Sequence, residues 1–338
     1  MNYFHSDEPF ITESGETLAT VTIAYNTYGT INAERNNVVW VCHALTSNSA
    51  ATEWWPGMVG ENTVIDPADY FIVCANIPGS CYGSTGPLSN NPETGKPYYS
   101  DFPMITIKDI VRCLILLRKH LQVEKIFLLM AGSMGGYQAL EWAVIEKNCI
   151  KNLFLITTSA AESAWGIAIH TAQRLAIEAD KSWTDKSTEA GKNGLKAARA
   201  IGLLTYRNYT IFVERQTDKD NEKINHFKAS SYINYQGDKL VSRFNAQSYW
   251  ILTKAMDSHN LARGRNKTIK EVLQSISQNV LIIGIASDIL CPVQEQKFIA
   301  DCLPNAAYVE IDSSYGHDGF LIEYEKISYH LSKWLRTV

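Results

Sequence analysis

Ile-Phe-Leu-Leu-Met-Ala-Gly-Ser-Met-Gly-Gly, at residues 126–136, is the stretch that decides the fold of this chain. An apolar run leads into Ser133, which is closely flanked by glycines. A helical pattern follows at once, with Tyr137, Leu140 and Val144 three and four residues apart. Residues at that spacing share one face of a helix, so the segment predicts a strand, a sharp turn and a helix. Such a turn exposes the serine oxygen beyond the end of the strand, where it can act as a nucleophile.

The turn departs in one position from the usual G-x-S-x-G pattern, because Ala131 takes the place of the first glycine. Alanine is the smallest side chain available, so we expect the turn to form. A phosphate-binding loop would need G-x-x-x-x-G-K-[ST] or G-x-G-x-x-G, and neither is present here. A plain glycine-rich connection remains the alternative, but the pattern favours Ser133 as a nucleophile.

The composition is that of an ordinary globular protein, with 338 residues, 46% of them hydrophobic, and a net charge of −4. This length suits one large α/β core with an insertion, or two modest domains. The charge balance does not indicate nucleic-acid binding, so we expect no nucleic-acid partner. We find neither an apolar run long enough for a membrane span nor a signal-peptide pattern, so we expect no membrane association.

Seven cysteines are present, an odd number, and no two form a C-x-x-C pair. Cys42, Cys74, Cys113 and Cys149 lie in or beside apolar segments, which is typical of buried free thiols. Free thiols in a chain without a secretion signal indicate the cytoplasm. H-E-x-x-H, paired C-x-x-C and EF-hand patterns do not occur, so we predict no metal site.

Short apolar runs alternate with helical patterns over the first half of the chain. Strands are predicted at Val38–Cys42, Tyr70–Cys74, Ile126–Met130 and Leu153–Thr157, and helices at Ile105–Leu121 and Met134–Glu146. This alternation predicts an α/β protein with a mostly parallel sheet and helices on both faces. The opening segment Thr17–Tyr28 alternates apolar and polar residues, which predicts an antiparallel hairpin at the sheet edge.

Between about residues 160 and 277 the pattern changes, and charged helical segments replace the buried strands. Alternation then resumes, with strands at Val280–Ala286 and Tyr308–Ile311 and helices at Val293–Cys302 and Gly319–Arg336. We therefore predict a core domain of residues 1–159 and 278–338 and a helical lid insertion of residues 160–277. An insertion at this point of the sheet is expected to cover the site.

Two loops beyond this insertion carry candidate partners for Ser133. A serine nucleophile needs a base, and the base needs an acid that orients it. After a turn of this kind the chain order is serine, then Asp or Glu, then His. Asp288 follows one late predicted strand and His317 follows the next, so both lie at the strand ends that carry Ser133. Alone, Asp288 could be a helix N-cap and His317 a surface histidine; together the three predict a catalytic triad in an α/β-hydrolase fold.

An oxyanion hole requires two backbone N–H groups aimed at the developing charge. One is expected from Met134, directly after the nucleophile. The other is expected from Leu45, in the loop after the strand Val38–Cys42. His43 in the same loop is interpreted as holding the loop by hydrogen bonds, because His317 fills the role of base.

Further segments carry a resemblance that extends from near residue 20 to near residue 325. They are His43–Thr46, Cys81–Pro87, Thr94–Pro97, Asp101–Pro103, Gly132–Gly136, Gln138–Trp142, Leu204–Arg207, Ser248–Tyr249, Met256–Asp257, Ser287–Asp288 and Tyr315–Asp318. In these segments and in their order, the chain resembles the homoserine O-acetyltransferases of the α/β-hydrolase superfamily. A generic esterase would share only the turn around Ser133.

The resemblance implies transfer of an acetyl group from acetyl-CoA to the hydroxyl of L-homoserine, in methionine biosynthesis, by a ping-pong route through acylated Ser133. It implies Arg199 and Tyr206 at the substrate carboxylate and Asp318 at the substrate ammonium. It also implies a homodimer and no permanently bound cofactor. Arg199 and Tyr206 are about two helical turns apart and so share a face, and a guanidinium suits a carboxylate. Without the resemblance, Arg199 would be interpreted as a solvated helix arginine.

Some positions depart from the family pattern. Thr46 is followed by Ser47-Asn48 where the family usually has Gly-Asp, and Ile77-Pro78 replaces Val-Leu. These changes leave the acyl donor and acceptor open, so homoserine or serine O-succinyltransferase is an alternative. An esterase or deacetylase with the same triad is a second alternative, which Arg199, Tyr206 and Asp318 argue against. A non-catalytic scaffold is a third, which the intact triad argues against.

Overall fold

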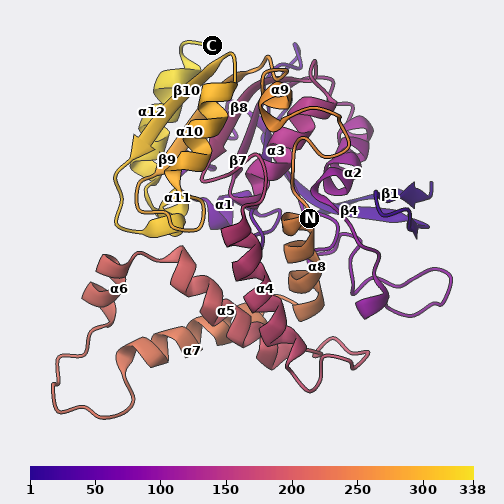
Figure 1. The fold of residues 1–338 in the computed structure, drawn as a ribbon. Helices are drawn as coiled ribbons and strands as arrows, with labels where there is room; N and C mark the ends of the chain where they lie inside the picture. Colours follow the sequence, from indigo (N-terminus) through magenta and orange to yellow (C-terminus); the bar gives the residue numbers. More distant parts are fainter.

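The computed structural model describes residues 1–338 and contains one large sheet of eight strands (Figure 1). Their order across the sheet is β1 (Asn2–Ser6), β4 (Val21–Tyr28), β6 (Phe71–Ala75), β5 (Val38–Cys42), β7 (Ile126–Gly132), β8 (Ile150–Ile156), β9 (Asn279–Ile285) and β10 (Ala306–Ile311). From β6 to β10 every pairing is parallel. The expected α/β fold with a mostly parallel sheet is thus confirmed.

The hairpin expected at Thr17–Tyr28 is wrong. Thr17–Leu18 forms β3, which pairs with β2 (Phe10–Ile11) in a separate two-stranded ribbon. The other half of the segment, β4, lies antiparallel to both β1 and β6. The alternating pattern correctly predicted extended backbone, but a strand buried between two partners must take them from elsewhere in the chain.

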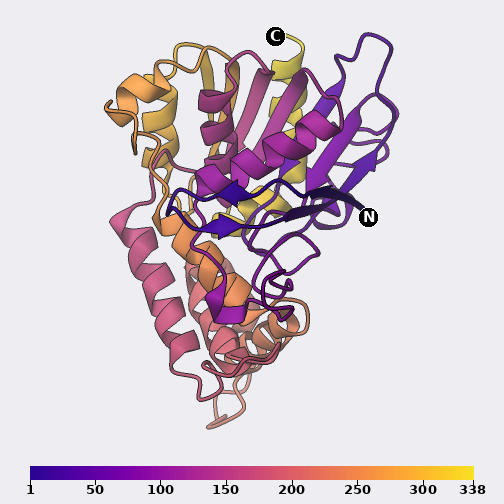
Figure 2. The same ribbon diagram turned by 90° about the vertical axis from the view of Figure 1, so that its right-hand side faces the viewer.

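Helices cover both faces of the sheet, as Figure 2 shows from the side. One face packs against α2 (Ile107–His120), α3 (Met134–Ile145) and α10 (Val293–Cys302), and the other against α1 (Ala51–Trp54) and α12 (Tyr324–Leu335). Successive residues of a strand point to opposite faces. Accordingly, Trp40 belongs to the first hydrophobic cluster and its neighbour Val41 to the second. A strand covered on both faces reads as a continuous apolar run, which is why β5 could be recognised in the sequence.

The C-terminal helix is divided. Instead of one helix from Gly319 to Arg336, α11 (Gly319–Ile322) ends at Glu323 before α12 begins. The carbonyl of Phe320, which an unbroken helix would bond to the N–H of Tyr324, accepts a hydrogen bond of 3.0 Å from the indole N–H of Trp55. This tertiary contact has no local sequence signal.

No strand lies between β8 and β9, where helices fill the chain: α4 (Ala164–Glu178), α5 (Lys192–Tyr206), α6 (Tyr209–Gln216), α7 (Lys228–Val241), α8 (Ala246–Asp257) and α9 (Ile269–Leu273). Most of them stand below the sheet in Figure 1, whereas α9 packs against α10.

The two chain segments that connect this helical part to the sheet meet at residues 160–162 and 259–261, and we call this pair of segments the neck. The N–H of Glu162 donates to the carbonyl of His259 over 2.9 Å, and the N–H of Leu261 donates to the carbonyl of Ala160 over 3.1 Å. The outgoing and returning chains therefore run side by side. None of the helices combines the length and the apolar character needed to cross a membrane.

Candidate active site

Ser133 lies at the tight turn between β7 and α3, in a backbone conformation that L-residues rarely adopt. Its φ is +55° and its ψ is −129°. The turn brings the start of α3 against β5, so that a Cβ added to Gly135 would lie 2.2 Å from the carbonyl oxygen of Cys42. Only glycine fits at such a distance. The expected turn is thus present, with Ala131 buried at its base.

Two hydrogen bonds hold the backbone of Ser133 in this conformation. Its N–H donates to the carbonyl of Ile156 over 3.0 Å, and its carbonyl accepts from the hydroxyl of Thr158 over 3.0 Å. Both partners come from the end of β8 and the residues that follow it. Backbone strain persists only where neighbours enforce it, and here the adjacent strand does so.

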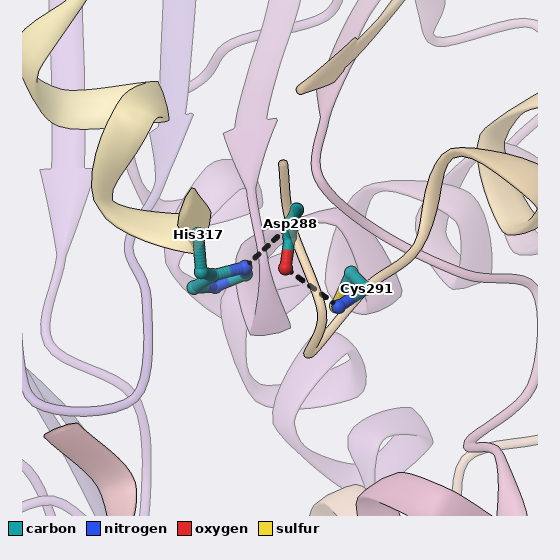
Figure 3. A group of neighbouring side chains, drawn as sticks. All are labelled: Asp288, Cys291 and His317. Atoms are coloured by element: carbon teal, nitrogen blue, oxygen red, sulfur yellow. Dashed lines mark hydrogen bonds and ion pairs between the residues drawn. The ribbon is translucent and has the colours of Figure 1, made fainter. Parts of the chain in front are cut away.

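The structure brings Ser133, Asp288 and His317 together. His317 Nε2 lies 2.9 Å from Ser133 Oγ, and His317 Nδ1 lies 2.7 Å from Asp288 Oδ2 (Figure 3 shows the second contact). The other oxygen of Asp288 accepts from the N–H groups of Leu290 and Cys291, over 2.8 and 2.9 Å. An ionised carboxylate only accepts hydrogen bonds, so Nδ1 carries the proton and Nε2 is free to accept from the serine hydroxyl.

Cys291 adds a thiol to this group, and a ligand atom of Asp288, Cys291 and His317 each lies within 4.8 Å of the others. A metal ion could use such an arrangement. However, both nitrogens of His317 are already hydrogen bonded, and burial raises the pKa of the Cys291 thiol well above its ordinary value. A cation here would have to break the contacts of the triad, so we assign the cluster to proton transfer.

The two backbone groups expected to form the oxyanion hole are available. Leu45 follows β5, and its N–H makes no hydrogen bond within the chain. Met134 is the first residue of α3, where an N–H has no intrahelical partner. His43 holds the Leu45 loop as expected: its Nδ1 lies 2.8 Å from the carbonyl of Ala44, and its Nε2 accepts from the N–H of Ile77 over 3.3 Å. Burial lowers the pKa of His43 to about 4, which keeps it neutral.

Two residues that sequence reasoning missed also position this loop. The amide of Gln138 donates to the carbonyl of His43 over 3.2 Å. Arg243, which follows α7, donates to the carbonyl of Thr46 over 2.6 Å and to the hydroxyl of Tyr82 over 2.8 Å. The loop is thereby held from both the core and the helical part. A long sequence separation and an exposed arginine leave no pattern from which this contact could be predicted.

A cavity of about 350 Å³ opens above the triad. Its lining contains the predicted residues Leu45, Ser133, Arg199, Tyr206, His317 and Asp318. Asp288 and Met134 do not line it, because they lie fully buried behind His317 and at the start of α3. The cavity is also lined by Thr46, Ser47 and Arg207, which the sequence analysis named without a role in binding, and by His170, Gln173, Gln236, Lys239 and Arg243, which it did not single out.

Arg199 and Tyr206 share one face of α5, as their spacing predicted. The guanidinium carbon of Arg199 lies 5.4 Å from the centroid of the Tyr206 ring. That ring lies in turn 5.9 Å from the imidazole of His317. The Nε of Arg199 is buried and makes no hydrogen bond with the protein. The pair thus presents a cation and a phenol to the cavity beside the base.

Asp318 has a partner that the sequence analysis did not anticipate. It forms an ion pair with Arg207, whose Nε and Nη2 also donate to the hydroxyl of Tyr232 over 3.2 and 3.1 Å. Arg207 directly follows α5, and Tyr232 belongs to α7. Asp318 therefore links the triad loop to α5 and α7 of the helical part. A carboxylate has more acceptor positions than one arginine fills, so Asp318 can still accept from a second cation.

Comparison with known proteins places these features in context. A family model described as the alpha/beta hydrolase fold matches residues 37–324. The curated homoserine O-acetyltransferase of Cyclobacterium marinum is 49% identical over 331 residues, which cover 98% of this chain and 94% of that relative.

Solved structures agree with that likeness. A homoserine O-acetyltransferase from Bacillus anthracis superposes with a TM-score of 0.90 at 26% identity, over 99% of this chain and 96% of that one. An acetylester hydrolase from Corynebacterium glutamicum superposes with a TM-score of 0.86 at 19% identity, over 98% and 95% of the two chains. The second likeness shows a shared fold alone.

Proposed function

The chain belongs to the homoserine O-acetyltransferase family of α/β-hydrolases, and we propose that it moves an acetyl group from acetyl-CoA to homoserine through an ester on Ser133. The observation that carries this proposal is the cavity. It is lined by a nucleophile and a base, Ser133 and His317, and also by a cation and a carboxylate, Arg199 and Asp318, which match the two charges of an amino acid. Simple hydrolysis would need only the first two of these.

In the first step, Ser133 Oγ attacks the thioester carbonyl and its proton passes to His317 Nε2. The N–H groups of Leu45 and Met134 stabilise the negative charge on the carbonyl oxygen. The carbon–sulfur bond then breaks, and the CoA sulfur takes the proton from His317. Asp288 keeps the imidazole in the required tautomer throughout.

In the second step, the homoserine hydroxyl gives its proton to His317 and attacks the ester on Ser133. The ester bond breaks, and Ser133 recovers the proton. Arg199 and Tyr206 hold the carboxylate of homoserine, and Asp318 accepts from its ammonium beside Arg207. Orienting the alcohol in this way favours it over water, which cannot use these contacts.

We also propose that residues 160–277 act as a lid on a core formed by residues 1–159 and 278–338. The groups assigned to homoserine support this division, because Arg199 and Tyr206 lie on α5 whereas Ser133 and His317 lie in the core. The acyl donor then reacts with core residues, whereas the acceptor is bound through its carboxylate by the lid and through its ammonium by Asp318 of the core.

A thiol-release assay tests the proposed reaction. Acetyl-CoA and succinyl-CoA are each supplied with homoserine, with serine or with no acceptor. We expect slow release from acetyl-CoA alone and at least about tenfold faster release with homoserine, since one oriented contact has an effect of this size. If no amino acid accelerates release while simple acetate esters are cleaved quickly, the chain is an esterase.

The family assignment also leads us to propose a homodimer that forms through the lid. Large apolar side chains are exposed on and near α5, α6 and α7, namely Leu204, Tyr209, Val213, Ile224, Phe227 and Tyr235. Helix α7 and the segment between α6 and α7 project away from the core in Figure 1, and exposed apolar surface marks contact sites. Analytical ultracentrifugation of wild type and Tyr209→Glu tests this proposal. We expect wild type to sediment as a dimer and the variant to dissociate into monomers at a higher protein concentration. A monomeric wild type would contradict the proposal.

A further inference from the structure

Gln173 is a buried glutamine whose side-chain amide makes no hydrogen bond with the protein. It lies on α4, its exposed fraction is 1%, and neither Oε1 nor Nε2 has a partner. An amide removed from water without partners destabilises a fold. Because Gln173 lines the cavity above Ser133, a bound ligand can supply the missing partners.

The amide lies beside Tyr206. A Cβ added to Gly202 would lie 2.9 Å from Gln173 Nε2 and 3.2 Å from the hydroxyl of Tyr206. Glycine at this position of α5 therefore leaves room for both groups, although it lowers helix propensity. Tyr206 in turn neighbours both Arg199 and His317. Gln173 thus faces the part of the cavity that receives the amino acid in the proposed reaction.

The charges around the cavity favour a neutral hydrogen-bond acceptor for the ammonium group of the amino acid. The lining contains Arg199, Arg207, Lys239 and Arg243, whereas Asp318 is its only carboxylate. Asp318 is already paired with Arg207. An α-ammonium group carries three N–H donors, and it would meet mostly like charges. The carbonyl oxygen of an amide accepts from an ammonium and repels no nearby carboxylate as a second acid would.

We propose that Gln173 recognises the α-ammonium of the acceptor through Oε1 and so selects amino acids over other alcohols. This rests on the proposed function, which supplies homoserine as the acceptor. On the other side of the same amide, Nε2 can donate to the α-carboxylate held by Arg199. A single glutamine thus matches the two neighbouring charges of an amino acid.

The test compares homoserine with 4-hydroxybutyrate, which has the same hydroxyl and carboxylate but no ammonium. Gln173→Met keeps the length of the side chain and removes the amide. For homoserine, kcat/KM should fall at least about tenfold, the effect of one hydrogen bond to a charged group. For 4-hydroxybutyrate, kcat/KM should fall clearly less, because this acceptor loses only the contact of Nε2 with its carboxylate, and acetyl-enzyme formation from acetyl-CoA alone should be unchanged. The melting temperature should be equal or higher, because an unpartnered buried amide has been removed.

Gln247→Met is the matched control. Gln247 is a buried glutamine of the neighbouring helix α8 that also has an unpartnered amide oxygen, but it does not line the cavity. Its kinetics should match wild type. Equal losses for both acceptors, or slower acetyl-enzyme formation in Gln173→Met, would overturn the assignment to the ammonium.

Failure of the proposed function itself is distinguishable. Wild type would then transfer no acetyl group to homoserine, whatever residue 173 is. Calorimetric titration of homoserine into wild type and Gln173→Met still decides the role of Gln173 in that case. Binding weakened about tenfold or more in the variant supports the proposal, and equal or absent binding in both proteins overturns it.

Discussion

The two ends of the cavity differ in how their polar groups are satisfied. At the core end, Ser133, His317 and Asp288 are bonded to one another or to the backbone around them. At the lid end, Gln173 and the Nε of Arg199 are buried without partners. The groups proposed to react are thus already bonded to one another in the folded chain, whereas the groups proposed to recognise the amino acid lack partners that a ligand could supply. Mutation at the core end should therefore impair both half-reactions, whereas mutation at the lid end should impair only the transfer to the amino acid.

The largest effect on activity is expected from Ser133→Ala, at the core end of the cavity. We expect loss of acetyl transfer by about 10³-fold or more, because triad members act as a unit. The fold should remain intact, since the substitution removes only a hydroxyl. Mass spectrometry of wild type incubated with acetyl-CoA should find one acetyl group on the peptide that contains Ser133. An acetylated cysteine, or near-normal turnover in the variant, would show that the nucleophile is another residue.

At the lid end, Arg199→Ala should damage only one of the two steps. Acetyl-enzyme formation should continue at the wild-type rate, while kcat/KM for homoserine drops about tenfold to hundredfold. That range corresponds to roughly 1.5–3 kcal/mol for a hydrogen bond to a charged group. Rapid-quench measurement of each half-reaction separates the two steps. Equal damage to both would mean that Arg199 supports the structure of the lid.

Asp318 lies where the two ends of the cavity meet, beside His317 and Arg207. Asp318→Ala tests whether this residue acts in recognition or in support of the base. The ratio of homoserine-dependent to background thiol release should fall by about tenfold, since an ammonium contact is lost while the triad remains. Asp312→Ala is the control, because Asp312 is exposed and close in sequence but outside the cavity. A fall in background release as large as the fall in the ratio would instead place Asp318 among the groups that support His317.

The smallest effect on the reaction rate near neutral pH is expected from a substitution of His259 at the neck, which should change the stability instead. His259 stacks on Tyr137 with ring centroids 4.1 Å apart. Burial lowers the pKa of His259 to about 3, below the ordinary value near 6.5. The unfolded chain therefore binds more protons than the folded one between these values. Stability is fully present above pH 6.5 and is lost as the pH falls toward 3.

His259→Gln should reduce this acid sensitivity. Wild type should lose about 2 kcal/mol more than the variant between pH 7 and pH 5, measured by urea unfolding. Glutamine can still donate to the carbonyl of Ser159, which His259 Nε2 contacts over 3.1 Å. Identical pH dependence in the two proteins would mean that the pKa of His259 is the same in the folded and unfolded states.

The contrast between the ends also explains which features the sequence could reveal. Strand β5 and the turn at Ser133 were predictable because a buried strand is uniformly apolar and the turn requires glycine. The triad followed from chain order at the strand ends. The pair of Arg207 with Asp318 and the contact of Arg243 with Thr46 were not predictable, because each joins segments far apart in the chain and involves common surface residue types. Gln173 was missed for another reason: one glutamine on a helix has no pattern, and only its lack of partners in the folded chain marks it.

The neck between β8 and β9 has an evolutionary consequence. These strands are neighbours in the sheet, about 4.8 Å apart, and hydrogen bonds between residues 160–162 and 259–261 clasp the ends of the insertion. The entropy of closing a loop grows only slowly with its length. An insertion of different length can therefore be accommodated between these strands without a change in the register of the sheet, provided that it keeps the apolar residues of α8 that pack into the core. Ser133 and His317 lie in the core, so changes within the insertion can alter the specificity for the acceptor while the proposed nucleophile and base stay in place.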